Sequence, residues 1–283
     1  MTAFLLAGAQ FDPVFGEPES NRATTEDWIR RAARAGARLV VLPEACVSGY
    51  VFDDRAEALR YAEEVPDGPS VTLWSALCRE LDLYVVAGIV ERRGEQVFNA
   101  AVLVGPEGWL GTFHKAHLWN DEKELFDPNT EGFPVVETEL GRIGIGICYD
   151  AWFPETFRTA ALAGADLLAL PANWVPVPGQ PETVPTMAAM LCMTGAHSNH
   201  FYVAGISRTG IERGQPFIGR SLIVGPDGWP LAGPVSGESE ELLLAEVDLV
   251  GTREQRWGNP FNQPVLDRRP DLYRSDPAQK PAD

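Results

Sequence analysis

The stretch that decides the fold is RIGIGICYDAWFPE, residues 142–155, in which an apolar run leads directly to a cysteine. Isoleucine at every second position of this run has the period of a β-strand, which we predict over residues 143–147. Pro154 followed by Glu155 suits the first turn of a helix, predicted over residues 154–163. Cys148 is therefore expected at a strand-to-helix turn.

The position of Cys148 has two interpretations. Backbone N–H groups and the positive end of a helix near a thiol favour the thiolate and can hold an oxyanion, so this cysteine is a candidate nucleophile. Most single cysteines are instead small buried side chains without a chemical role. The other cysteines, Cys46, Cys78 and Cys192, are dispersed without a Cys-x-x-Cys pair, which predicts neither a zinc site nor a disulfide framework.

The composition excludes several classes of protein. The chain has 283 residues, 45% of them hydrophobic, and no linker divides it, so we expect one domain over residues 1–267 and a C-terminal tail over residues 268–283. The net charge of −17 argues against nucleic acid and anionic membranes as partners. No basic leader is recognisable, and no apolar run approaches the ~20 residues that span a bilayer, so a soluble, cytoplasmic protein is expected.

Alternating periods along the rest of the chain predict a layered α/β protein. Strands are predicted over residues 4–10, 39–42, 84–90, 97–104, 166–170, 201–207, 219–224 and 242–247. Helices are predicted from Ser20, as probable cap, to residue 36, and over residues 68–81 and 186–199. The similar segments VGPEGW at 104–109 and VGPDGW at 224–229 predict hairpins, and they indicate either two halves of related topology or shared turn chemistry. Residues 253–273 are poor in apolar residues, which is more typical of an arm lying on a neighbour than of a packed element.

Polar residues follow several of the predicted strands. Glu44, Cys148 and Asn173 each come at or just after a strand end, and Lys115 follows the first hairpin. Ligands of α/β sheets bind outside the carboxyl ends of the strands, so these residues are expected on one rim. A cysteine nucleophile needs a base for its proton and a cation or N–H groups for the oxyanion, and Glu44 and Lys115 offer both.

Other chemistries have weaker support in the sequence. Two histidine pairs, at positions 114 and 117 and at positions 197 and 200, have a spacing that can bind zinc. No recognisable motif with a cysteine or carboxylate accompanies them, so no metal site is expected. The glycines at 144 and 146 lack the third glycine of a dinucleotide fingerprint, and no Gly-x-Ser-x-Gly motif is present.

Three ordered segments carry a resemblance to a known family. LPE at 42–44, FHKAHL at 113–118, and GICYD at 146–150 followed by FPE at 153–155 resemble the nitrilase superfamily of carbon–nitrogen hydrolases. The resemblance covers nearly the whole chain, as far as DRRPDLY at 267–273. It implies an α/β fold arranged as a four-layer αββα sandwich. It also implies a homodimer or higher homo-oligomer, usually formed through helices into an eight-layer assembly.

The resemblance also implies a Glu-Lys-Cys triad. Glu44 would be the general base, Lys115 the cation that stabilises the tetrahedral intermediate, and Cys148 the nucleophile. The N–H of Tyr149 would be the second oxyanion donor. The chemistry would be acyl transfer through a thioester, and it would need no metal or organic cofactor.

The family often has a second active-site glutamate shortly after the lysine, and here Glu122 and Glu124 compete for this role. Glu122 is favoured because related amidases place an acid four residues before the phenylalanine that ends this loop. Either glutamate could simply be exposed to solvent, as charged loop residues usually are.

The expected substrate is a small neutral or cationic amide. CYD followed by WFPE resembles the amidase and carbamoylase branches more than the nitrilases, which tend to carry Cys-Trp-Glu-Asn. The loop at 173–185 has no lysine or arginine for a substrate carboxylate, although Arg208 or Arg213 could reach the site. The substrate-binding candidates are Tyr50, Tyr149, Trp152, Asn173 and Trp174.

Three alternatives to an amidase remain at this point. A nitrilase and an N-carbamoyl amine or amino acid hydrolase would use the same triad. A catalytically silent binding protein would be expected to have lost Glu44, Lys115 or Cys148, and all three are present.

Overall fold

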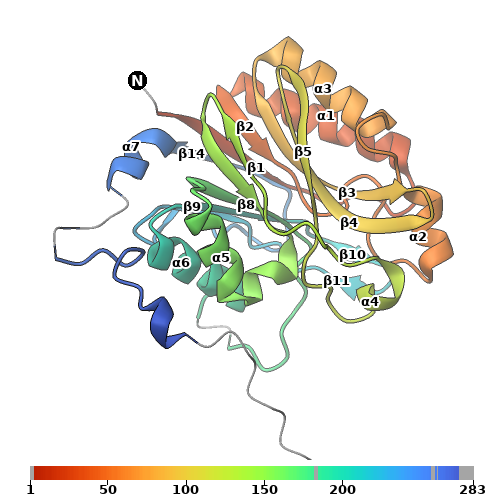
Figure 1. Ribbon diagram of the computed structural model, residues 1–283. Helices are drawn as coiled ribbons and strands as arrows, with labels where there is room; N and C mark the ends of the chain where they lie inside the picture. The colour runs from red at the N-terminus through yellow and green to blue at the C-terminus, as the bar shows by residue number, and fades with distance from the viewer. Residues whose placement is uncertain (1–2, 182–183, 256–258, 260, 274–283) are drawn as a thin grey trace, which may run out of the picture.

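The computed structural model describes residues 3–181, 184–255, 259 and 261–273, in which two six-stranded sheets pack face to face (Figure 1). The first sheet has the order β14 (Glu241–Val247), β1 (Phe4–Gln10), β2 (Ala37–Val41), β3 (Tyr84–Arg93), β4 (Gln96–Gly105) and β5 (Gly108–His114). The second has the order β13 (Pro230–Ala232), β12 (Leu222–Val224), β9 (Tyr202–Ser207), β8 (Leu167–Ala172), β7 (Gly141–Ile145) and β6 (Val135–Thr138). A short ribbon of β10 (Ile211–Glu212) and β11 (Gln215–Pro216) stands apart from both sheets.

Helices cover the outer face of each sheet. In Figure 1, α1 (Pro18–Arg34) and α3 (Pro69–Leu81) lie on the first sheet, and α5 (Pro154–Leu162) and α6 (Met187–Asn199) lie on the second. The shorter helices are α2 (Arg55–Tyr61), α4 (Glu122–Leu125) and α7 (Leu249–Gln255), with 3₁₀ turns at Cys148–Trp152 and Pro270–Leu272. The expected four-layer αββα sandwich is therefore confirmed.

The burial of β2 shows how the sequence specifies these layers. Leu39 and Val41 lie in the apolar core between the two sheets, whereas Val40 lies in the core between the first sheet and its helices. A strand with apolar residues on both faces must be covered on both sides, as its continuous apolar run predicts. A third core fills the space between the second sheet and α5 and α6.

The two halves of the chain repeat one topology. In the first half β1, β2 and β3 are parallel and joined through helices, and β4 and β5 follow as antiparallel neighbours. In the second half β7, β8 and β9 are parallel, and β12 and β13 follow in the same way. The similar segments at 104–109 and 224–229 form the turns of equivalent hairpins, the first between β4 and β5 and the second between β12 and β13. The hairpins are confirmed, and the interpretation as two related halves holds.

Several predicted boundaries differ from the structure. Helix α1 begins at Pro18 with Glu17 as its N-cap residue, not at Ser20, because proline is well suited to the first helical position. The predicted arm at 253–273 begins inside α7, where Arg253 pairs with the buried Asp166. Part of that arm, residues 256–258 and 260, lies outside the described residues.

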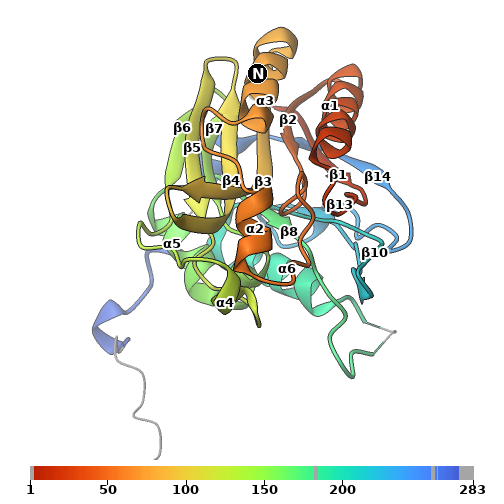
Figure 2. The ribbon, with the colours of Figure 1, turned by 90° about the vertical axis from the view of Figure 1, so that its right-hand side faces the viewer.

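The carboxyl ends of the parallel strands meet at one end of the sandwich. Helices α2 and α4 and the β10–β11 ribbon gather at this end, on the right in Figure 1 and toward the viewer in Figure 2. Among the described residues, no helix is both long enough and apolar enough to cross a bilayer.

Candidate active site

Cys148 lies where β7 gives way to α5. It begins the 3₁₀ turn Cys148–Trp152, three residues after the end of the strand at Ile145. Its φ of 45° is a left-handed conformation that non-glycine residues rarely adopt, and such strain is found preferentially at functional sites. Its thiol is unpaired and Cys148 is half-buried, whereas the other three cysteines are fully buried. The predicted strand-to-helix position is confirmed.

Asp150 fixes this turn to the segment that follows β5. Its Oδ2 accepts a hydrogen bond from the Ile147 N–H at 2.9 Å. Its Oδ1 accepts one from the His117 N–H at 2.9 Å and lies 2.6 Å from His117 Nδ1. The His117 ring stacks on Phe153, with 3.6 Å between the ring centroids. A completely buried carboxylate with these partners holds the two segments at a fixed separation.

Lys115, directly after β5, has a completely buried ammonium group between two carboxylates. Its Nζ donates to Glu44 Oε1 at 2.7 Å and to Glu122 Oε1 at 2.6 Å. Glu44 follows β2, and Glu122 is the first residue of α4. A buried charge is tolerated only when it is paired and hydrogen-bonded, which these contacts achieve for the lysine.

Two further buried side chains complete this cluster. Asn99, inside β4, donates from Nδ2 to Oε1 of both carboxylates, at 2.7 Å to Glu44 and 3.1 Å to Glu122. Its backbone oxygen accepts the N–H of Lys115 at 2.8 Å. The Tyr50 hydroxyl donates to Glu122 Oε1 at 2.7 Å. Asn99 therefore orients the lysine backbone and both acids.

The two competing glutamates have different surroundings. Glu122 is buried, and its second oxygen accepts a hydrogen bond from the Trp119 N–H at 2.7 Å. Glu124, two positions along α4, is exposed. The structure therefore brings Glu122 to Lys115 and leaves Glu124 at the surface.

Burial and charge shift the pKa values of the central groups. Burial raises the pKa of the Glu44 carboxyl, although the Lys115 ammonium opposes this. Burial also raises the pKa of the Cys148 thiol well above its usual value, with Glu44 acting in the same direction and Lys115 against it. Burial lowers the pKa of Lys115, but the carboxylates of Glu122 and Glu44 outweigh it and raise that pKa. The thiol thus gives up its proton less readily, the Glu44 carboxyl binds a proton more readily, and the Lys115 ammonium keeps its charge more firmly than in water.

The free oxygen of Glu44 suits it to accept a proton. Its Oε1 is shared by Lys115 and Asn99, whereas its Oε2 is buried with no hydrogen-bond partner among the described residues. An unsatisfied buried acceptor is uncommon and is a feature of catalytic groups. The Cys148 thiol, whose pKa Glu44 perturbs, is the nearby proton donor that the arrangement offers.

The five predicted substrate-binding residues lie in different surroundings, and one of them is in the core. Asn173 is buried, yet neither atom of its amide has a hydrogen-bond partner among the described residues. Tyr149 and Trp152 are half-buried neighbours in the turn after the nucleophile, with ring centroids 5.9 Å apart. Tyr50 touches the catalytic cluster through Glu122. Trp174 differs from the prediction, because its ring packs in the core between the second sheet and its helices instead of on the rim.

Neither arginine that could have reached the site is available for a substrate. Arg208 is buried against Glu212 and Asp12. Arg213 donates to both carboxylate oxygens of Glu57, at 2.7 and 2.8 Å. The histidine pairs likewise contact other groups, with His114 Nε2 2.8 Å from Glu91 Oε2. The described residues contain no group of three His, Cys, Asp or Glu side chains arranged for a metal ion.

Sequence reasoning did not identify Asn99 or Asp150 as site residues. Asn99 had a usable signal, since it is a single amide in the otherwise apolar core of the β4 sequence. Asp150 was part of a quoted motif, but its contact with His117 depends on two segments that only the folded chain brings together.

Comparison with known proteins agrees with this geometry. A family model described as carbon-nitrogen hydrolase matches residues 5–256. The chain is 39% identical over 268 residues to a protein named nitrilase from Pyrococcus abyssi, with 95% of this chain and 98% of that protein covered. It is 30% identical over 274 residues to an N-carbamoylputrescine amidase from Solanum lycopersicum, with 90% and 89% covered.

A solved structure extends the likeness to the fold. The crystal structure of an amidase from Nesterenkonia sp. superposes with a TM-score of 0.80 at 26% identity, covering 95% of this chain and 94% of that one. The family model spans both sheets and every residue of the buried cluster around Lys115. The chain therefore belongs to the carbon–nitrogen hydrolases of the nitrilase superfamily.

Proposed function

We propose that the protein is an amidase that hydrolyses a small carboxamide to a carboxylic acid and ammonia through a cysteine thioester. The observation that best supports this proposal is the Lys115 ammonium, buried between Glu44 and Glu122 and close enough to Cys148 to influence its pKa. A preorganised buried cation beside a nucleophile is suited to the negative charge that develops on a carbonyl oxygen.

The reaction would begin with attack of Cys148 Sγ on the amide carbon while Glu44 Oε2 takes the thiol proton. The carbonyl π electrons move to the oxygen, where the Lys115 ammonium and the Tyr149 N–H stabilise the charge. Collapse breaks the C–N bond, and Glu44 gives its proton to the departing nitrogen as ammonia leaves. Water then attacks the thioester while Glu44 accepts one of its protons. Breakage of the C–S bond releases the acid, and Glu44 returns that proton to the departing sulfur, which restores the thiol.

The substrate is expected to be neutral or cationic. Both nearby arginines are engaged by carboxylates of the protein, so neither offers a free guanidinium to a substrate carboxylate. The buried Asn173 amide, whose donor and acceptor have no hydrogen-bond partner in the described part of the chain, suits a polar group of the substrate.

Two other activities, hydrolysis of a nitrile and hydrolysis of a carbamoylated amine, each have a specific observation in their favour. The relatives named nitrilase and N-carbamoylputrescine amidase make a nitrile and a carbamoylated amine the competing substrates. The same nucleophile and base would serve both, so the products decide between them. A silent binding protein is the remaining alternative, and it would release ammonia from none of these compounds.

The test is ammonia release from aliphatic amides, cationic ω-amino amides, N-carbamoyl amines, N-carbamoyl amino acids and nitriles, with Cys148→Ala as the matched control. Release from amides by the wild type alone, with a covalent acyl adduct seen by mass spectrometry, supports the proposal. Preferential turnover of nitriles or carbamoyl compounds would replace it with one of the two alternatives. Preferential turnover of anionic amides would contradict the substrate class.

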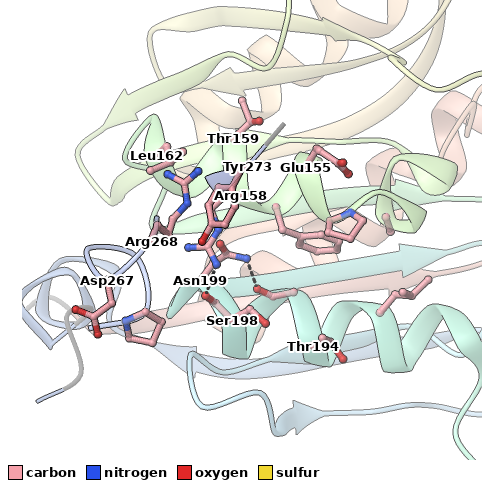
Figure 3. A pocket seen from close by; sticks show the side chains of 16 residues that line it. Glu155, Arg158, Thr159, Leu162, Thr194, Ser198, Asn199, Asp267, Arg268 and Tyr273 are labelled. Carbon is pink, nitrogen blue, oxygen red and sulfur yellow. Dashed lines mark hydrogen bonds between the residues drawn. The ribbon is translucent and has the colours of Figure 1, made fainter. Parts of the chain in front are cut away.

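We further propose that the protein forms homodimers through α5 and α6. These helices and the segment 264–273 surround a cavity of about 720 Å³ (Figure 3). Arg158 and Asn199 both line it, and Arg158 Nη1 and Asn199 Oδ1 are buried without a partner among the described residues. Leu162 on the same face is 53% exposed. A second copy would cover the leucine, so Leu162→Glu should convert dimers to monomers in sedimentation experiments.

A cytoplasmic location is also part of the proposal. All four cysteines are free thiols, and three of them are fully buried and distant from any disulfide partner. Proteins of oxidising compartments more often use their cysteines in disulfides. Fractionation of the source cells with an antibody against the protein would test the location.

A further inference from the structure

A buried ion pair lies behind the loop that carries Tyr50. Arg208, directly after β9, donates from Nη1 to Glu212 Oε2, and both side chains are almost completely buried. Arg208 Nη2 donates to the Asp12 carboxylate and, at 2.9 Å, to the Pro13 backbone oxygen. The guanidinium is therefore fully engaged by the protein, and it holds Glu212 in one orientation.

The other oxygen of Glu212 binds the Tyr50 loop. Oε1 accepts hydrogen bonds from two consecutive backbone N–H groups, at 2.7 Å from Tyr50 and 2.6 Å from Val51. Two adjacent donors on one oxygen fix the orientation of the peptide planes, and so the direction in which the Tyr50 side chain leaves the backbone.

The Tyr50 ring then continues toward the catalytic cluster. It packs edge-on against Phe217, with 6.1 Å between the ring centroids. The centroid of the Phe217 ring in turn lies 4.4 Å from the Arg208 guanidinium carbon. The Tyr50 hydroxyl donates to Glu122 Oε1, the same atom that receives the Lys115 ammonium. One continuous set of contacts thus runs from Arg208 to the oxyanion-stabilising lysine.

We propose that Glu212, held by Arg208, is a positioning residue for catalysis, which it serves by fixing Tyr50 so that the hydroxyl orients Glu122 and Lys115. The inference rests on the proposed amidase function, because it concerns the same lysine. A role in stability alone explains it poorly, since apolar residues of similar volume can replace buried ion pairs without loss of stability. Glu212 does not touch the reacting atoms, and its effect must pass through Tyr50.

The experiment is a double-mutant cycle read by alkylation of Cys148 with iodoacetamide. The other cysteines are buried, so the rate reports the nucleophile without requiring turnover. Tyr50→Phe removes the hydroxyl, and Glu212→Gln removes the carboxylate that fixes the loop. Each single variant should alkylate about tenfold more slowly, as expected for loss of a hydrogen bond to a charged group, and the double variant should be no slower than Tyr50→Phe.

Glu212→Asp keeps the result interpretable if Glu212→Gln fails to fold. Aspartate retains the charge that faces Arg208, but its shorter side chain withdraws from the Tyr50 and Val51 N–H groups. We expect a melting temperature close to that of the wild type together with slower alkylation. Glu57→Gln, which removes the half-buried carboxylate paired with Arg213, is the matched control and should leave the rate unchanged.

The outcomes separate the two proposals. Multiplicative effects of Tyr50→Phe and Glu212→Gln, or wild-type alkylation by Glu212→Asp, would overturn the positioning role. Failure of the wild type to turn over any amide would contradict the amidase function, and the alkylation cycle would still decide the role of Glu212. Where turnover is measured, the loss should appear in kcat with little change in KM, because Glu212 acts on the group that stabilises the transition state.

Discussion

Replacing Lys115 by methionine tests the electrostatic reading of the buried cluster. Methionine keeps the length of the side chain and removes the charge, leaving Glu44 and Glu122 to face each other. Because both Oε1 atoms bind the same Nζ, at 2.7 and 2.6 Å, they lie no more than about 5.3 Å apart. At an effective dielectric constant of about 20, two negative charges at that distance repel by about 3 kcal/mol.

This repulsion gives the variant a characteristic pH dependence. In folded Lys115→Met, burial and the Glu122 carboxylate raise the pKa of Glu44 without the opposing ammonium, whereas a glutamate titrates near about 4.3 in the unfolded chain. Between the pKa of about 4.3 in the unfolded chain and the raised pKa in the folded variant, the folded state binds more protons than the unfolded state. Stability must therefore fall as pH rises, so the loss relative to wild type should be small near pH 5 and reach about 3 kcal/mol near pH 8.

The assay is urea unfolding of wild type and variant at both pH values. Lys123→Met is the control, because that lysine is exposed in the same segment and should show no pH-dependent loss. Adding Glu122→Gln to Lys115→Met should restore most of the stability at pH 8, since only one charge then remains. A loss that is equal at the two pH values, or larger at pH 5, would refute the reasoning.

Three further outcomes follow from the same geometry. Cys148→Ala should abolish ammonia release and the acyl adduct while its melting temperature stays within a few degrees of wild type; measurable turnover would remove the thiol from the mechanism. Glu122→Gln should lower kcat/KM by about tenfold or more, as expected for the loss of a hydrogen bond to a charged group. Glu124→Gln, at an exposed position, should leave kcat/KM unchanged. Equal kinetics of the two variants would contradict the distinction between the two glutamates. Asn173→Leu should lower kcat/KM on the best amide without lowering the melting temperature, because its amide makes no hydrogen bond with the described residues; a marked loss of stability would show a structural role instead.

The layers of the fold were predictable because strong local signals specify them. Each of these signals corresponds to a central strand or a hairpin in the structure. They are the apolar run before Pro43, the alternation at 143–147 and the two Gly-Pro-acid-Gly turns. The short elements had no comparable signal. Helix α4 has a single turn, and the β10–β11 ribbon has two residues per strand, so neither shows a period in sequence.

The site was predictable to the extent that its residues lie in recognisable segments. Glu44, Lys115 and Cys148 were named from three motifs, and the structure places them as electrostatic neighbours. Trp174 was named from its residue type, but its ring packs in the core against Gly205, where an added Cβ would lie 2.7 Å from it. Glu212 could not be foreseen, since its contact with Tyr50 joins residues 162 positions apart.

The repeated topology divides the chemistry between the two sheets. Glu44 and Lys115 follow strands of the first half, and Cys148 and Asn173 follow strands of the second. The apolar layer between the sheets aligns the Glu44 carboxyl with the Cys148 thiol across the halves, together with polar contacts such as those of Asp150 with His117 and of Glu212 with Tyr50. Since a misplacement of about 1 Å can reduce a rate about a hundredfold, a small slip of one sheet over the other would disable the enzyme before it unfolded. Substitutions such as Val41→Ala or Ile145→Val, buried in the core between the sheets, would then alter the alignment on which turnover depends.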